Sequence, residues 1–249
     1  MAIMIPNRPH TFSPASLEGI MFEGLEKLPD DYYVFHSLRI STVVDNTFHE
    51  SETDFVVFNK RLGILCLEAK AGQVQYKDGY WLYGSGEPMH NGGPFNQASS
   101  NKWKLIKYFE NHRFASILDK CKFLHAVWFP SITEDKVRTM ILPTESDRSL
   151  IMTQEALSDP EPYLERIFAT ELPGGKETNL SDNDSNRIMR EILCPQFNVF
   201  PSVTFEADLK KIEDKMIELA RQKETFVRKD ITKAEAMATY TEKGDEYKC

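Results

Sequence analysis

The sequence is poor in the patterns that build zinc sites and disulfide frameworks. Its four cysteines, Cys66, Cys121, Cys194 and Cys249, are far apart and include no C-x-x-C pair. Structural zinc sites and disulfide frameworks need cysteines at short, regular spacing. The six histidines contain no H-x-x-x-H or H-E-x-x-H pattern, which argues against a zinc protease. We therefore expect a protein of a reducing compartment.

Long apolar runs are also missing. No run approaches the roughly 18 apolar residues that a membrane-spanning helix requires, and no charged-then-apolar leader opens the chain. The phosphate-binding motif G-x-x-x-x-G-K-[ST] is absent too, because Gly174, Gly175 and Lys176 have the wrong spacing. These absences predict a soluble, cytoplasmic protein with no membrane contact and no helicase motor of its own.

An excess of positive charge is missing as well. Thirty Lys and Arg against 38 Asp and Glu give a formal net charge of −8. A protein that binds nucleic acid over its whole surface would need more Lys and Arg. Residues 59–125 nevertheless contain ten basic and five acidic side chains, a local charge of +5. This segment could form a localised phosphate site or ordinary solvated surface.

The order of apolar patterns indicates one large α/β domain. Residues 12–31 have apolar side chains at helical spacing after Ser13 and Pro14, and residues 32–41 follow as a strand. Asp78 and Gly79 lie between aromatic strand-forming residues and predict a two-residue hairpin. Residues 97–112 predict a second helix, and residues 123–129 an inner strand. Such an order predicts a mixed central sheet flanked by helices.

The stretch ETDFVVFNKRLGILCLEAKAG, residues 52–72, has charged side chains at the ends of two apolar strands. If the strands pair across the turn between them, residues whose numbers add to 122 face each other. Asp54 then lies opposite Glu68, and Glu52 opposite Lys70, with Cβ atoms about 4.5–5.5 Å apart. Because side chains alternate along a strand, Glu68 and Lys70 also point to one face. The pattern therefore places four charged groups at one end of an apolar hairpin.

Two carboxylates this close repel each other unless positive charge lies between them. Mg²⁺ suits such a pair, since it is typically held by one or two carboxylates and also accepts phosphate oxygens. With Lys70 nearby, the arrangement supports metal-dependent hydrolysis of a phosphodiester bond. The alternative is a salt-bridge cluster that fastens the end of a sheet.

The same stretch is similar to the E-x-D, strand, turn, strand, E-x-K pattern of the PD-(D/E)xK nuclease superfamily. More narrowly, it resembles the nuclease-related domain (NERD). SLEGIMFEGLEKLPDDYYVFHSLRI resembles that family's opening helix and strand. This implies that Glu18 is the helix carboxylate that completes a metal site, although the family's usual glycine before it is Leu17 here. KDGYW and GPFNQA resemble a D-G-x-W hairpin and an N-P-x-x-Q-A helix start, which implies a site role for Gln97.

Together these features predict a restriction-endonuclease-like fold that hydrolyses DNA with Mg²⁺ or Mn²⁺. Glu18, Asp54 and Glu68 would bind the metal directly or through water. Lys70 would act on the attacking water and the scissile phosphate, and Gln97 would orient one of these groups. Two alternatives stay open: a catalytically silent module that binds nucleic acid or a helicase, and an RNA-directed nuclease. Repair and antiviral defence also remain alternatives.

The aromatic residues Tyr76, Tyr80, Trp81 and Tyr83 could stack on nucleic-acid bases. Side chains in such a hairpin also commonly pack within the sheet.

A domain boundary is predicted between residues 204 and 205. Residues 1–204 would form the nuclease-like domain, and residues 205–249 a helical extension with an apolar stripe at spacings of four and three: Phe205, Leu209, Ile212, Met216 and Leu219. The stripe could pack on its own domain. Alternatively, residues 205–226 could dock on a second copy of the chain or on a helicase-type ATPase, since residues 123–130 and 150–168 resemble the continuation found in NERD-containing helicases.

Overall fold

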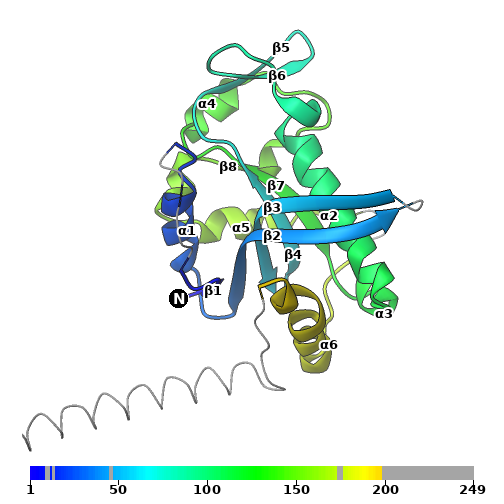
Figure 1. The fold of residues 1–249 in the computed structure, drawn as a ribbon. Coiled ribbons are helices and arrows are strands. Elements are labelled where there is room, and N and C mark those ends of the chain that lie inside the picture. Colours follow the sequence, from blue (N-terminus) through cyan, green and yellow to red (C-terminus); the bar gives the residue numbers. More distant parts are fainter. Residues whose placement is uncertain (9–11, 13–14, 45–46, 173–175, 198–249) are drawn as a thin grey trace, which may run out of the picture. The chain divides into compact units, whose positions relative to one another are not determined.

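The computed structural model describes residues 1–8, 12, 15–44, 47–172 and 176–197. It contains a six-stranded sheet with helices on both faces (Figure 1). In chain order the strands and helices are β1 (Ile3–Ile5), α1 (Glu18–Glu26), β2 (Tyr32–Val44), β3 (Thr47–Asn59), β4 (Gly63–Ala69), β5 (Val74–Lys77), β6 (Tyr80–Tyr83), α2 (Pro94–Asn111), α3 (Ala115–Leu118), β7 (Phe123–Trp128), α4 (Glu134–Thr139), β8 (Ile151–Met152), α5 (Glu161–Phe168) and α6 (Asp182–Arg187). The predicted boundary at 204/205 and the apolar stripe lie outside the described residues.

The strand order in the large sheet is β1-β2-β3-β4-β7-β8. Strands β2, β3 and β4 are antiparallel neighbours, whereas β1 is parallel to β2, and β7 is parallel to both β4 and β8. Strands β5 and β6 form a separate hairpin. The predicted mixed α/β sheet is therefore confirmed, and it is consistent with a restriction-endonuclease-like core.

The two faces of the sheet carry different helices. Buried side chains of α1 and α5 form one cluster with the sheet, which includes Met21, Leu164 and Trp128. Phe95 of α2 instead packs with Val127, the residue before Trp128 on β7. Since successive side chains of a strand point to opposite faces, α2 lies across the sheet from α1 and α5 (Figure 1).

The hairpin of β3 and β4 has the predicted register. Phe55 pairs with Leu67, and Asn59 with Gly63, so the paired numbers add to 122. The Asn59 side chain accepts hydrogen bonds from the backbone N–H groups of residues 61 and 62. Gly63 has φ 116°, and a Cβ atom there would lie 2.3 Å from the Lys122 carbonyl oxygen. A side chain at this position is therefore excluded by both its backbone angle and its close packing.

Helix α1 begins at Glu18, later than the sequence pattern predicts. Leu17 has φ 57° and ψ 10°, which is the left-handed conformation. This conformation interrupts a helix and costs a residue other than glycine about 1–2 kcal/mol. The predicted cap, Ser13, and Pro14 lie outside the described residues. The left-handed turn makes Glu18 the first residue of the helix.

Two other elements also differ in length from their predictions. Helix α2 begins at Pro94 rather than Gln97, because proline suits the first helical turn. Strands β2 and β3 extend as a long ribbon beyond the covered sheet (Figure 1), up to the pair Val44 and Thr47. The predicted strand ended at residue 41 and the predicted apolar hairpin began at residue 52, so the outer part of this ribbon was not predicted. The described residues include no helix that is long and apolar enough to cross a membrane.

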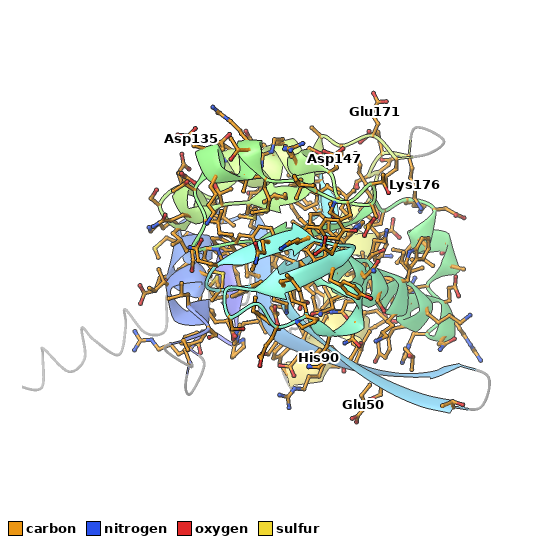
Figure 2. The ribbon with its side chains drawn as sticks, turned by 90° about the horizontal axis from the view of Figure 1, so that it is seen from above. Glu50, His90, Asp135, Asp147, Glu171 and Lys176 are labelled. Atoms are coloured by element: carbon orange, nitrogen blue, oxygen red, sulfur yellow. The ribbon has the colours of Figure 1, made fainter. Side chains whose placement is uncertain are left out.

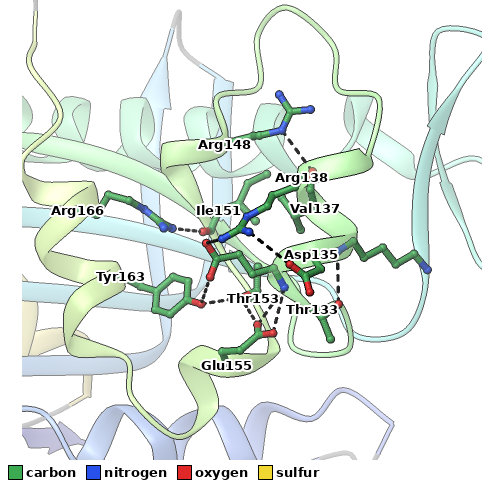
Figure 3. Close-up of polar contacts among 12 residues, drawn as sticks. Thr133, Asp135, Val137, Arg138, Arg148, Ile151, Thr153, Glu155, Tyr163 and Arg166 are labelled. Atoms are coloured by element: carbon green, nitrogen blue, oxygen red, sulfur yellow. Dashed lines mark hydrogen bonds and ion pairs between the residues drawn. The ribbon is translucent and has the colours of Figure 1, made fainter.

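A polar network joins α4, β8 and α5 around a cavity of about 220 Å³ (Figure 3). Arg148 donates to the Val137 carbonyl oxygen, and Arg166 to that of Ile151 at 2.6 Å. The Tyr163 hydroxyl lies 2.9 Å from Thr153 Oγ1. Because these arginines already bond to backbone oxygens, the network stabilises the loops at this end of the sheet.

Candidate active site

The structure brings Asp54, Glu68 and Lys70 together at the end of the β3–β4 hairpin. Asp54 lies one residue beyond the last β3–β4 pair, and its Oδ2 accepts the Ala69 N–H at 2.7 Å. Lys70 Nζ donates to Glu68 Oε1 at 2.6 Å. The side chains of Glu68 and Lys70 are only 7% and 17% exposed. Three ionisable groups therefore share a largely buried position, where unbalanced charge is costly.

Burial and mutual repulsion shift the proton affinities of these groups. Burial, followed by repulsion from Glu68, raises the pKa of Asp54 from 3.8 to about 7. Burial also raises the pKa of Glu68, although Lys70 opposes this effect. Burial acts to lower the pKa of Lys70, but the Glu68 carboxylate outweighs it and the pKa is raised. The site consequently holds a carboxylate pair whose full ionisation needs additional positive charge.

Glu18, at the start of α1, acts electrostatically on Asp54, but its carboxylate bonds elsewhere. Its Oε2 atom lies 3.0 Å from His36 Nε2 of β2. His36 is buried, and its ring contacts the rings of Phe12, Phe22 and Phe55. The aromatic surroundings fix the imidazole, so the imidazole fixes the direction of the Glu18 carboxylate. Sequence reasoning missed His36, and the signal for it was a lone histidine directly after the apolar run of residues 32–35.

The donor set fits a hard divalent cation. Asp54 and Glu68 supply two adjacent carboxylates, which is as many as Mg²⁺ commonly takes from a protein. Glu18 is close enough to Asp54 to contribute to its raised pKa. In the part of the chain that the structure describes, no three His, Cys, Asp or Glu residues are near enough to one another to share an ion. Glu18 would therefore have to turn from His36 to become a third ligand.

Gln97 lies in the first turns of α2 and lines a cavity of about 580 Å³ together with Glu68. Its Nε2 donates to the His90 carbonyl oxygen at 2.9 Å, which holds the amide beside the cavity. Lys104 of α2 also lines this cavity, which we call the α2 cleft. Viewed from above, His90 and the ribbon residue Glu50 lie on one side of the molecule, and Asp135 and Asp147 lie on the opposite side (Figure 2).

The predicted opposition of Glu52 and Lys70 is wrong. The β3–β4 pairing ends at Phe55, and β2 places Arg39 opposite Glu52. Arg39 Nε donates to Glu52 Oε2 at 3.1 Å, and both side chains are substantially exposed. Glu52 still lines the α2 cleft, where its carbonyl oxygen accepts a hydrogen bond from Asn101. The charged cluster at the hairpin end therefore contains three groups and not four.

The hairpin aromatics pack mainly within the protein. Trp81 is 3% exposed, and its ring contacts Phe95 and Phe129. Tyr76 packs against Trp81. Tyr80 differs, since it is 63% exposed at the tip of the hairpin. The sheet-packing interpretation therefore holds for Trp81.

Comparison with known proteins gives one family assignment and several short similarities. The short similarities are to threonine–tRNA ligases: 48% identity over 48 residues for Bacteroides fragilis (strain YCH46), and 52% over 44 residues for Phocaeicola vulgatus (strain ATCC 8482). These cover 19% and 18% of this chain but only 7% of each ligase, so they assign no ligase activity to it. No solved structure shows significant similarity. The model of the nuclease-related domain matches residues 15–130, which include Glu18, Asp54, Glu68, Lys70 and Gln97. Residues 15–130 of this chain are therefore a nuclease-related domain.

Proposed function

We propose that this protein is a metal-dependent nuclease that hydrolyses DNA phosphodiester bonds. The observation that carries the proposal is the buried Asp54 and Glu68 pair with Lys70 Nζ 2.6 Å from Glu68. Glu68 also lines the α2 cleft, so a strand in the cleft would reach the Glu68 carboxylate. The location of these residues in a nuclease-related domain supports the same chemistry.

Asp54 and Glu68 would hold Mg²⁺ or Mn²⁺, with Glu18 as a third ligand. When bound, the ion supplies positive charge at the scissile phosphate and lowers the pKa of water. The carboxyl of Asp54 must release its proton to bind the ion, and its pKa near 7 makes that release possible at neutral pH. A bound cation would also relieve the repulsion between Asp54 and Glu68.

Lys70 would act as a donor and not as a base. Its raised pKa keeps the ammonium group charged at neutral pH. With Glu68 as a metal ligand, the Lys70 ammonium group would donate to a phosphate oxygen or orient the attacking water. Gln97, held by its bond to the His90 carbonyl, would orient the substrate phosphate from the α2 side of the cleft.

A partner would deliver the substrate. The net charge of −8 gives the chain little affinity for a polyanion outside the cleft. Tethering to a helicase-type ATPase or to a second copy through residues 205–226 would raise the effective concentration of the nuclease at its substrate. Repair and antiviral defence are the two settings that this arrangement suits.

A second candidate function is a silent module that binds nucleic acid or a helicase without cutting. The close ion pair between Lys70 and Glu68 favours it, because this pair neutralises Glu68 without a metal. Single-stranded and duplex DNA and RNA, incubated with Mg²⁺ or Mn²⁺, separate the candidates. We expect cleavage of DNA by the wild type, and none by Asp54→Ala or in EDTA. Binding without cleavage would identify the silent module, and cleavage of RNA alone would identify an RNA-directed nuclease.

A further inference from the structure

Trp103 of α2 is a large aromatic side chain left in solvent. It is 61% exposed, whereas the other two tryptophans of the chain, Trp81 and Trp128, are 3% and 0% exposed. A single exposed apolar residue is ordinary. Trp103, however, lies beside the α2 cleft, where an exposed indole could contact a ligand bound in the cleft.

Helical spacing places Trp103 on the edge of α2 that continues the cleft wall. Asn96 and Ser100 line the cleft, and Trp103 follows them by seven and three residues. Residues three, four and seven apart lie on one side of a helix. Trp103 is therefore nearly one turn beyond Ser100, or about 4.5 Å farther along the helix axis. The indole extends the wall away from the end of α2 where Gln97 lines the cleft together with Glu68.

One lysine ammonium group lies against this indole, and two further lysines follow along the helix. Lys102 Nζ lies 4.7 Å from the centroid of the Trp103 ring. Lys104, the next residue along the helix, lines the cleft. Lys107 is one turn further and forms an ion pair with Glu110. An aromatic surface beside ammonium groups suits a ligand that combines a flat ring with phosphates.

We propose that Trp103 stacks on an unpaired base of a single-stranded nucleic acid whose backbone passes Lys104 toward Glu68 in the α2 cleft. The choice of a single strand follows from stacking itself, because internal bases of a duplex already stack on their neighbours. Stacking accepts any base, so this contact would hold substrate without reading its sequence. The proposal rests on the proposed nuclease function for the presence of nucleic acid in the cleft.

The intrinsic fluorescence of the protein provides the test, since Trp103 is the one exposed indole. The probe is an oligothymidylate of about 12 nucleotides, added without divalent metal to the full chain carrying Asp54→Ala, so that no cleavage interferes. We expect the oligonucleotide to quench the fluorescence and a duplex of equal length to quench it much less. Trp103→Ala should weaken the Kd of the single strand by about 5- to 150-fold. Trp103→Phe should abolish the quenching and restore part of the affinity.

An oligonucleotide with the same phosphates but abasic sugars separates stacking from charge. It should bind the parent and Trp103→Ala proteins equally. The proposal is overturned if Trp103→Ala keeps the parent Kd, or if Tyr80→Ala, which removes the exposed aromatic residue of the β5–β6 hairpin, causes the loss instead. If the wild type cleaves and Trp103→Ala does not change binding, the stacking proposal is wrong and the nuclease function still holds. If binding depends on Trp103 but the protein never cleaves, the nuclease function is wrong and the stacking proposal still holds.

Discussion

Replacing Asp54 by asparagine should stabilise the folded protein at neutral pH in metal-free buffer. The pKa of Asp54 rises from 3.8 to about 7 on folding, chiefly through burial and then through repulsion by Glu68. Between these values the unfolded chain has released the proton and the folded protein still holds it. The contribution of Asp54 to the free energy of unfolding is therefore fully present below pH 3.8. It decreases as pH rises above 3.8 and is lost once pH has passed about 7. Asparagine does not ionise in this pH range, so Asp54→Asn should not show this loss of stability.

The expected magnitude follows from the shift. One pKa unit corresponds to about 1.36 kcal/mol, so the wild type should lose about 3 kcal/mol between pH 5 and pH 8 through Asp54. Asparagine can still accept the Ala69 N–H, while its buried amide group costs about 1 kcal/mol. At pH 8 the full shift corresponds to about 4 kcal/mol, which leaves a net gain of about 3 kcal/mol for Asp54→Asn.

Urea denaturation in EDTA at pH 5 and pH 8, followed by circular dichroism, measures the loss of stability of the wild type between the two pH values. It also measures the gain of Asp54→Asn over the wild type at pH 8. Comparing each protein with itself at the two pH values cancels the cost of the amide. Glu87→Gln, which changes an exposed carboxylate, is the matched control and should follow the wild type. Equal pH dependence in the wild type and Asp54→Asn would refute the reasoning. So would a loss of stability at pH 8, which would mean that the ionised carboxylate fastens the sheet as a salt bridge.

The remaining predictions concern metal binding and two backbone positions. Mn²⁺ at 100 times its Kd should stabilise the wild type by about 2.7 kcal/mol in thermal unfolding and leave Asp54→Ala unchanged; equal shifts would place the ion elsewhere. Leu17→Gly should be about 1 kcal/mol more stable to urea than Leu17→Ala, because only glycine adopts the left-handed turn freely; the reverse order would contradict the strain. Gly63→Ala should cost about 2–4 kcal/mol in urea, since its Cβ meets the Lys122 carbonyl, whereas Gly79→Ala has open space and should cost about 1 kcal/mol. Equal losses in the two alanine variants would argue against the contact at Gly63.

The hairpin of the candidate site was predictable because local rules determine it. Apolar alternation and the turn at Asn59 set the register, and the register places Asp54 beside Glu68. The partner of Glu52 was not predictable from that hairpin, because Arg39 belongs to β2, the strand on the other side of β3.

Contacts between distant elements were the harder part of the site. The bond between His36 and Glu18 joins β2 to α1, and no spacing within either element indicates it. The exposure of Trp103 was equally hidden, because helical periodicity shows which residues share an edge and not which edge the sheet covers.

Strand β3 joins two regions of unequal local stability. Phe55 and Phe58 are fully buried, whereas Glu52 is exposed on the outer ribbon. Amide hydrogens of the outer ribbon should exchange with solvent through small local openings, and those of the inner strand only through much larger ones. Asp54 lies at the transition between these regimes. Local opening of the outer ribbon would therefore change the wall of the α2 cleft at Ser51 and Glu52, while the buried inner strand would keep Asp54 and Glu68 in place.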